Sequence, residues 1–179
     1  MYQDVIMSGF GGQGIQIISQ IAALAAIRKG LEITYLPSYG VEKRGGRTNV
    51  TMVISDSEIG SPITNHPMAI IALDIIALET FQPVVREGGV VIANTSLIPE
   101  ELFTRQDVQL VRIRSNEEAL AMGNAKVANM ICLGAYLQRT AYMSFGDIES
   151  VIGDVIPERL KHTIPDNLKA IQKGMDLAR

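Results

Sequence analysis

A glycine-rich loop near the start of the chain has a spacing that suits phosphate binding. Gly9, Gly11 and Gly14 form a Gly-x-Gly-x-x-Gly pattern between an apolar run and a helix-like segment, with Gly12 and Gln13 inside the loop. Glycines let backbone N–H groups approach a phosphate closely, and the start of a helix adds partial positive charge. We therefore interpret all five residues as candidates for phosphate or pyrophosphate binding. The alternative is a tight strand-to-helix turn that holds no ligand.

The residues that follow argue against a simple NAD(P) dehydrogenase. A Rossmann NAD site needs an Asp or Glu about 20 residues beyond the glycines, at the end of the second strand. Leu36, Pro37 and Ser38 occupy that place, and Glu32 lies at the wrong end of its expected strand. No basic residue comes directly after this strand to bind a 2′-phosphate.

A second loop, expected at residues 37–47, combines glycines with basic side chains. Arginine can grip a phosphate or carboxylate through two parallel hydrogen bonds. A solvated surface turn is the alternative, but two glycine-rich loops at one sheet edge favour an anionic ligand or a partner subunit. The candidate binding residues of this loop, which also contains Lys43, are Ser38, Tyr39, Gly40, Arg44, Gly45, Gly46 and Arg47.

Both loops need a sheet that brings them to one edge. Strand-like apolar runs alternate with helical patterns, which predicts a single domain over residues 1–179 with an α/β fold. We expect a three-layer α/β/α sandwich, a mostly parallel sheet with a small antiparallel hairpin, and a Rossmann-like first βα unit. The expected strands are residues 5–8, 31–36, 48–54, 69–73, 90–93 and 109–113, with 58–60 returning as a short antiparallel partner. The expected helices include 13–29, 75–81, one through 127–137, one after a capping box at Ser144, and one through 168–175.

Composition and charge exclude several classes of protein. The chain has 179 residues, 47% of them hydrophobic and 20% charged, which is typical of a globular domain. Its net charge of -3 argues against broad nucleic-acid binding. The apolar runs are too short to span a membrane, and the first residues lack a signal-peptide pattern, so we expect a cytoplasmic protein. The single cysteine, Cys132, is too few for an iron–sulfur cluster.

The two loops together resemble the gamma subunit of 2-oxoacid:acceptor (ferredoxin) oxidoreductases. The first reads Gly-Phe-Gly-Gly-Gln-Gly-Ile at residues 9–15, and the second reads Pro-Ser-Tyr-Gly-Val-Glu-Lys-Arg-Gly-Gly at 37–46. The same module occurs as one domain of the single-chain pyruvate enzymes. Further similarity lies at residues 53–62, 71–74, 91–94 and 128–135, so the resemblance covers nearly the whole chain.

The resemblance implies a role in a larger enzyme. The family couples oxidative decarboxylation of a 2-oxoacid to acyl-CoA formation and ferredoxin reduction, with thiamine diphosphate and iron–sulfur clusters on other subunits or domains. It implies that the gamma module helps bind coenzyme A and closes over the thiamine site. On this basis the residues at 11–14 cradle one CoA phosphate and Arg44 and Arg47 neutralise another. Asn94 and Asn129 are candidates for contacts near the ligand or an interface, and structural hydrogen bonds are the equal alternative.

Several points stay open at the level of sequence. The second loop reads Ser-Tyr-Gly, whereas the family resemblance associates Phe-Gly at this place with pyruvate-type members. This difference favours 2-oxoglutarate or branched-chain oxoacids over pyruvate. We assign no catalytic residue and no metal site, and we interpret Cys132 as a core residue. The competing functions are a stand-alone nucleotide- or flavin-binding module and a purely architectural subunit. A homodimer of the isolated chain is a further expectation.

Overall fold

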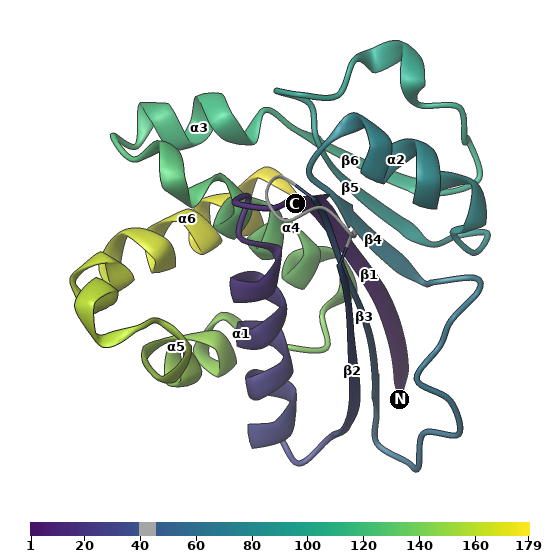
Figure 1. Ribbon diagram of the computed structural model, residues 1–179, viewed down its shortest axis with the longest axis horizontal. Helices are drawn as coiled ribbons and strands as arrows, with labels where there is room; N and C mark the ends of the chain where they lie inside the picture. The colour runs from purple at the N-terminus through teal and green to yellow at the C-terminus, as the bar shows by residue number, and fades with distance from the viewer. Residues whose placement is uncertain (40–45) are drawn as a thin grey trace.

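A six-stranded sheet lies at the centre of the computed structural model, which describes residues 1–39 and 46–179 (Figure 1). The strands are β1 (Tyr2–Phe10), β2 (Glu32–Tyr39), β3 (Arg47–Ser55), β4 (Ala69–Ala72), β5 (Val90–Asn94) and β6 (Gln109–Ile113). The α-helices are α1 (Ile15–Arg28), α2 (Ile75–Phe81), α3 (Ser115–Ala121), α4 (Ala128–Thr140), α5 (Phe145–Val155) and α6 (Ile164–Leu177). Short 3-10 turns are η1 (Gln82–Val84), η2 (Glu100–Leu102), η3 (Ala125–Val127) and η4 (Glu158–Thr163). Within the described ranges, no helix has the length and apolar composition needed to cross a bilayer.

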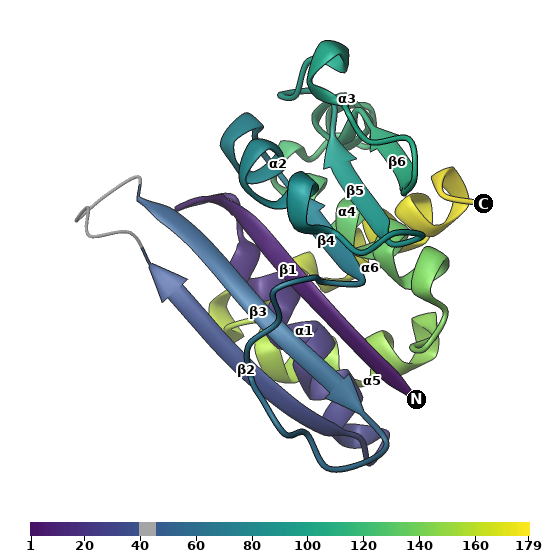
Figure 2. The same cartoon turned by 90° about the vertical axis from the view of Figure 1, so that its right-hand side faces the viewer.

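The sheet is mostly parallel, as the sequence predicted. Its strand order is β2-β3-β1-β4-β5-β6, and β1, β4, β5 and β6 pair in parallel. Strand β3 is antiparallel to both of its neighbours, so β2 points the same way as the parallel strands (Figure 2). Five strands therefore end at one edge of the sheet, and β3 begins there.

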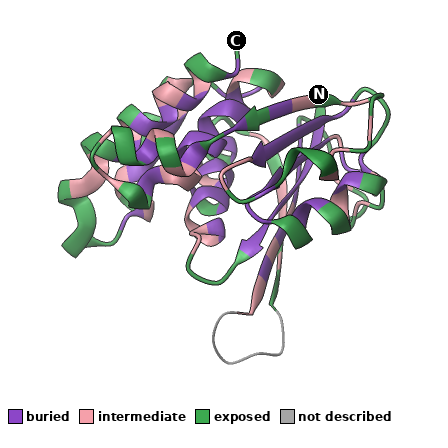
Figure 3. Ribbon diagram, turned by 90° about the horizontal axis from the view of Figure 1, so that it is seen from above, coloured by how far each residue is buried: buried purple, intermediate pink, exposed green. Residues whose placement is uncertain are grey.

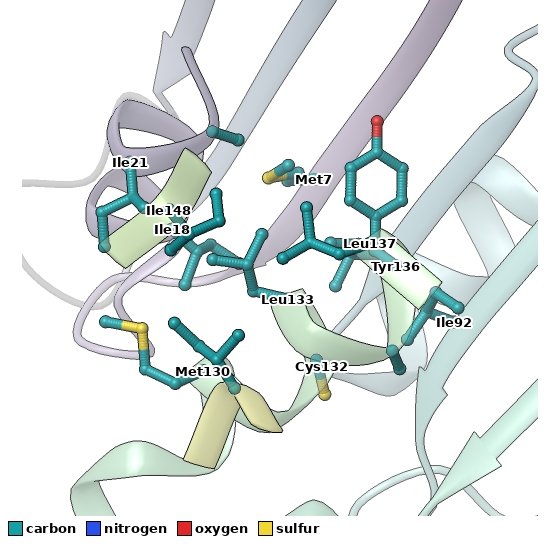
Figure 4. Close-up of a cluster of buried hydrophobic side chains, with 14 of the residues drawn as sticks. Met7, Ile18, Ile21, Ile92, Met130, Cys132, Leu133, Tyr136, Leu137 and Ile148 are labelled. Atoms are coloured by element: carbon teal, nitrogen blue, oxygen red, sulfur yellow. The ribbon is translucent and has the colours of Figure 1, made fainter. Parts of the chain in front are cut away.

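Helices cover both faces of the sheet and confirm the three-layer arrangement. Alternation along β1 sends Met7 to the face covered by α1, α4, α5 and α6, and Ile6 to the face covered by α2. The larger core joins Ile18 and Ile21 of α1 to Leu133 of α4 (Figure 4). Seen from above, the buried residues lie between the layers and the exposed ones on the outward surfaces of the helices (Figure 3).

The antiparallel hairpin is real, but the prediction misplaced it. Strands β2 and β3 form the hairpin, whereas residues 58–60 are not a strand. Strand β2 also continues through Pro37 to Tyr39, where the sequence predicted a loop. Proline lacks an N–H donor and is tolerated in edge strands, and β2 is an edge strand.

Helices α4 and α6 cross at close range through two glycines. An added Cβ atom at Gly134 would overlap the Ile171 carbonyl oxygen, and one at Gly174 would overlap the Ile131 carbonyl oxygen. Each glycine thus lies against the backbone of the opposite helix. This crossing holds the last helix of the chain against α4, and α4 packs against the sheet.

The predicted capping box at the start of α5 is present and makes stability depend on pH. The Asp147 carboxylate accepts hydrogen bonds from the Ser144 N–H at 2.7 Å and from Lys29 Nζ at 3.0 Å. Partial burial opposes its ionisation, but these hydrogen bonds outweigh burial and lower the pKa of Asp147. The lowered pKa means that the ionised carboxylate stabilises the folded state above the unfolded pKa of about 3.9.

We expect Asp147→Ala to lower the free energy of unfolding by about 1 kcal/mol at neutral pH, the usual size of a capping loss. The difference from the parent should shrink as pH falls from about 3.9 through the lower folded pKa, because the parent's carboxyl then becomes protonated. Urea unfolding at pH 7 and pH 3 measures both values. The exposed Glu149 of the same helix provides the control Glu149→Ala, which should have little effect at either pH.

Candidate functional site

The two glycine-rich loops meet at the edge where the parallel strands end. Phe10, the last residue of β1, pairs with Arg47, the first residue of β3. Immediately beyond this pair, the Gly11 N–H donates to the Gly46 carbonyl at 2.9 Å. The structure therefore brings the first loop against the end of the second, as the sequence predicted. Gly40, Lys43, Arg44 and Gly45 lie outside the described residues.

The first loop depends on glycine at two positions. Gly12 has a φ of 102° and Gly14 a φ of 76°, values that L-residues with a side chain rarely adopt. Gly14 is also the residue immediately before α1, and an added Cβ atom there would overlap the Asn129 side chain. The loop therefore turns directly into α1, whose first N–H groups have no acceptor within the helix. These N–H groups and the helix dipole favour an anion beside the loop.

Two predicted site residues hold the loop in place. The Gln13 side chain accepts from the Phe10 N–H at 2.6 Å and donates to the Leu73 carbonyl at 3.2 Å, which links the loop to the end of β4. Asn129 donates to the Gly14 carbonyl at 3.2 Å from the start of α4. Both side chains thus fix the backbone around the loop, and direct contact with a ligand stays a prediction for each.

Arg47 brings a cation to the edge between the two loops. Its guanidinium lies 3.6 Å from the Asp74 carboxylate, whose side chain is 5% exposed. Asp74 is also the N-cap residue of α2, since its carboxylate accepts a hydrogen bond from the Ala77 N–H at 2.9 Å. The Arg47 side chain is 30% exposed as a whole, but its Nε and Nη2 atoms are buried and donate no hydrogen bond within the described residues.

A cleft of about 430 Å³ adjoins the first loop on its α4 side. Its polar wall is formed by Gly12, Gln13, Asn94, Asn116, Lys126 and Asn129, and Leu73 and Leu97 add apolar surface. Sequence reasoning missed Asn116 and Lys126. Lys126 follows Asn124, which accepts from the Lys126 N–H at 3.1 Å, and a lysine in such a turn looks like any surface lysine in the sequence.

Asn94 shapes one wall of this cleft through hydrogen bonds within the chain. The residue is 3% exposed, donates to Asn116 at 3.2 Å and accepts from the Ser96 N–H at 3.2 Å. Ser96 also donates to Glu117, and this hydrogen bond is the main cause that lowers the pKa of the Glu117 carboxyl. The ends of β5 and β6 are therefore joined by a polar network beside the cleft.

Ser38 and Tyr39 end β2 at the same edge, but β3 separates them from β1. Both are exposed, and the Tyr39 hydroxyl accepts a hydrogen bond from Gln16 in the first turn of α1. Tyr39 thus reaches the first loop's helix, whereas Asn94 and Asn129 approach the loop from the opposite side.

Cys132 is a core residue, as the sequence predicted. It is fully buried in α4, and burial raises the pKa of its thiol to about 12. A thiol with this pKa is neutral at pH 7 and is a poor nucleophile. Among the described residues, no three His, Cys, Asp or Glu side chains gather in a way that would hold a metal ion.

Residues 4–177 match the family model described as pyruvate ferredoxin/flavodoxin oxidoreductase. The chain belongs to this family. It is a gamma-type subunit of the 2-oxoacid:ferredoxin oxidoreductases, as the resemblance of its loops implied. The chain is 34% identical to the 2-oxoglutarate synthase subunit KorC of Methanocaldococcus jannaschii, an alignment that covers 100% of this chain and 95% of that protein.

Two solved structures share the fold of this gamma-type subunit. The gamma subunit of a keto/oxoacid ferredoxin oxidoreductase from Geobacter sulfurreducens superposes with a TM-score of 0.81 at 29% identity, covering 98% of each chain. A 2-oxoglutarate:ferredoxin oxidoreductase from Magnetococcus marinus, with 2-oxoglutarate, coenzyme A and succinyl-CoA bound, gives a TM-score of 0.86 at 23% identity. That alignment covers 99% of this chain and 31% of the longer one, and at this identity the likeness concerns the fold alone.

Proposed function

We propose that this gamma-type subunit helps bind coenzyme A in a multi-subunit enzyme that oxidatively decarboxylates a 2-oxoacid to an acyl-CoA. The observation that carries the proposal is the meeting of the two glycine-rich loops, joined by the Gly11–Gly46 hydrogen bond, with Arg47 beside them. Coenzyme A carries a pyrophosphate and a 3′-phosphate. An edge with backbone N–H donors, a helix start and a guanidinium suits several phosphates at once.

The parts of the site take different roles in this proposal. The N–H groups of Gly12 and Gly14 and the start of α1 face one phosphate, whereas the Gly11 N–H is already donated to the Gly46 carbonyl. Arg47 neutralises another, together with Arg44 of the second loop. The neighbouring cleft, with Lys126 at its rim and amide side chains in its wall, suits the amide-containing pantetheine arm. Gln13 and Asn129 keep the loop in the shape that presents its N–H groups.

We further propose that thiamine diphosphate and the iron–sulfur clusters are bound by partner subunits, and that ferredoxin is the electron acceptor of the assembled enzyme. The chain's one cysteine, buried in α4, supports this division of labour. The oxoacid we favour is 2-oxoglutarate, on the basis of the Ser-Tyr-Gly of the second loop and the relative named 2-oxoglutarate synthase. Pyruvate and branched-chain oxoacids are the alternatives.

A crosslinking experiment on the assembled enzyme tests the proposal. The complex is purified through a tag on this chain, assayed for CoA-dependent 2-oxoacid oxidation, and irradiated with a photoreactive coenzyme A analogue. We expect label in peptides that contain residues 9–14 or 124–129, and unlabelled coenzyme A should compete with it.

Three outcomes would contradict the proposal. Label confined to the other subunits would indicate an architectural role for this chain. Recovery of the chain without partner subunits, or a flavin absorbance in the purified chain, would favour a stand-alone nucleotide- or flavin-binding module. The same assay, run with several oxoacids, identifies the substrate.

A further inference from the structure

A second pocket lies at the opposite edge of the sheet, where the parallel strands begin. Its volume is about 230 Å³, and its wall includes Gln3, Met68, Arg86, Gln109, Arg139 and Thr140. Gln3 lies near the start of β1, Gln109 begins β6, and Arg139 and Thr140 end α4. The strands of the sheet therefore separate this pocket from the two glycine-rich loops, and what it binds does not depend on the coenzyme A proposal.

Two exposed arginines, Arg86 and Arg139, are among the residues that line this pocket. Within residues 1–39 and 46–179, the side chains of Arg86 and Arg139 form no ion pair and donate no hydrogen bond. Arg105 is different, because it pairs with Asp107 through two hydrogen bonds of 2.5 and 2.7 Å. A guanidinium is a planar donor that matches the geometry of carboxylate and phosphate oxygens. Two of them on one recess predict an oxyanion between them.

Polar groups behind the arginines give the pocket a fixed wall. Gln3 is 7% exposed, and its amide lies beside the buried Tyr136 hydroxyl. Burial raises the pKa of Tyr136, and its hydrogen bonds with Tyr142 and Gln3 offset only part of this effect. The Tyr136 and Tyr142 rings pack edge to face with centroids 5.8 Å apart, which anchors this part of the wall in the core.

Two carboxylates lie in or near the pocket and offset part of its positive charge. Glu87 also lines the pocket, but it lies close enough to Arg105 to help raise the pKa of that guanidinium, after the larger effect of the hydrogen bond to Asp107. Asp4 is 1% exposed, and its carboxylate accepts from the Met68 N–H at 2.7 Å. Glu87 thus also interacts with Arg105, and Asp4 is buried and hydrogen-bonded to the backbone.

We propose that Arg86 and Arg139 bind a small free oxyanion, a phosphate or a short carboxylate, at this edge of the sheet. A pocket of about 230 Å³ is smaller than the roughly 300–1,000 Å³ of sites for drug-sized ligands, so its occupant is an ion and not a nucleotide. The two guanidiniums supply the charge, and the Gln109 amide, which donates one N–H to the Gly88 carbonyl at 3.3 Å, has a second N–H for the ion.

The test is calorimetric titration of the purified chain with inorganic phosphate, at an ionic strength held constant with sodium chloride. The double variant Arg86→Met/Arg139→Met should bind phosphate at least tenfold more weakly than the parent. Arg159→Met, which removes an exposed arginine from η4, should bind as the parent does. Arg47→Met provides a second comparison, because it removes the cation at the opposite edge.

The proposal is overturned by any of four results. The first is that the parent and the double variant bind phosphate equally well, and the second is that the parent does not bind it at all. Binding that is lost in Arg47→Met and kept in the double variant would place the ion at the glycine-rich loops. A double variant that binds phosphate as the parent does but no longer assembles would show that the arginines bind a partner subunit. Thermal unfolding of each variant shows whether a loss of phosphate binding is caused by loss of the folded structure.

Discussion

Replacing Gly174 by alanine is expected to lower the free energy of unfolding by about 3 kcal/mol, at the upper end of the cost of overpacking. The added Cβ atom would overlap the Ile131 carbonyl oxygen, so α6 must move away from α4 and lose part of their shared packing. Alanine's better helix propensity offsets about 1 kcal/mol at most, and steric overlap with backbone cannot be relieved by a side-chain rotation. The melting temperature should fall by about 6–12 °C for a chain of this size.

Gly153→Ala is the matched control for this prediction. Gly153 also lies inside a helix, α5, but an added Cβ atom there meets only the end of the Ile164 side chain, at 4.0 Å. We expect this variant to be as stable as the parent or more stable by up to about 1 kcal/mol, through helix propensity alone. Chemical denaturation of both variants gives the comparison. A Gly174→Ala variant as stable as Gly153→Ala would mean that α4 and α6 do not cross as closely as the structure shows.

Arg47→Met should raise the apparent KM for coenzyme A by about 10- to 100-fold in the assembled enzyme. Hydrogen bonds to charged groups contribute about 1.5–3 kcal/mol, and each 1.4 kcal/mol corresponds to about a tenfold change in affinity. The KM for the 2-oxoacid should stay the same, because the proposed role of Arg47 is confined to a CoA phosphate. Steady-state kinetics with each substrate varied in turn separates the two values.

Two further measurements make this second prediction specific. Arg47→Lys retains the charge next to Asp74 and should recover part of the affinity, whereas Arg159→Met should leave both KM values unchanged. Dephospho-CoA lacks the 3′-phosphate, so a loss of the Arg47 effect with this analogue would assign the arginine to that phosphate. An unchanged KM for coenzyme A in Arg47→Met would contradict the proposed role. Thermal unfolding of the complex must accompany the kinetics, because the substitution leaves buried Asp74 without its guanidinium.

The sequence predicted the sheet well where the local signal is strong. The fully apolar runs at β4 and β5 belong to strands buried on both faces, and short runs of this kind are typical of central parallel strands. The prediction ended the second strand before Pro37, whose tolerance in β2 follows from the place of β2 at the sheet edge. That place depends on the pairing of strands far apart in the chain, which no local pattern contains.

The candidate site was predictable in its backbone and less so in its side chains. Gly12 and Gly14 both have a positive φ, which favours glycine, and the glycine-rich sequence of the loop predicts such a backbone. The internal roles of Gln13 and Asn129 depend on a β4 carbonyl and on the start of α4, so only the folded chain reveals them. The sequence did not predict Asn116 and Lys126 as cleft residues for the same reason, because both are far from the loop in the sequence and only the fold brings them to the cleft.

Pro37 has a consequence for the chain before it joins its partner subunits. An exposed edge strand can template the addition of strands from other molecules, which leads to aggregation. Strand β2 carries exposed Leu36 beside Pro37, and proline offers no N–H for an incoming strand. The interruption makes strand-by-strand polymerisation at this edge less favourable. We therefore expect newly made chains to resist aggregation through β2 at high concentration before they assemble with the other subunits.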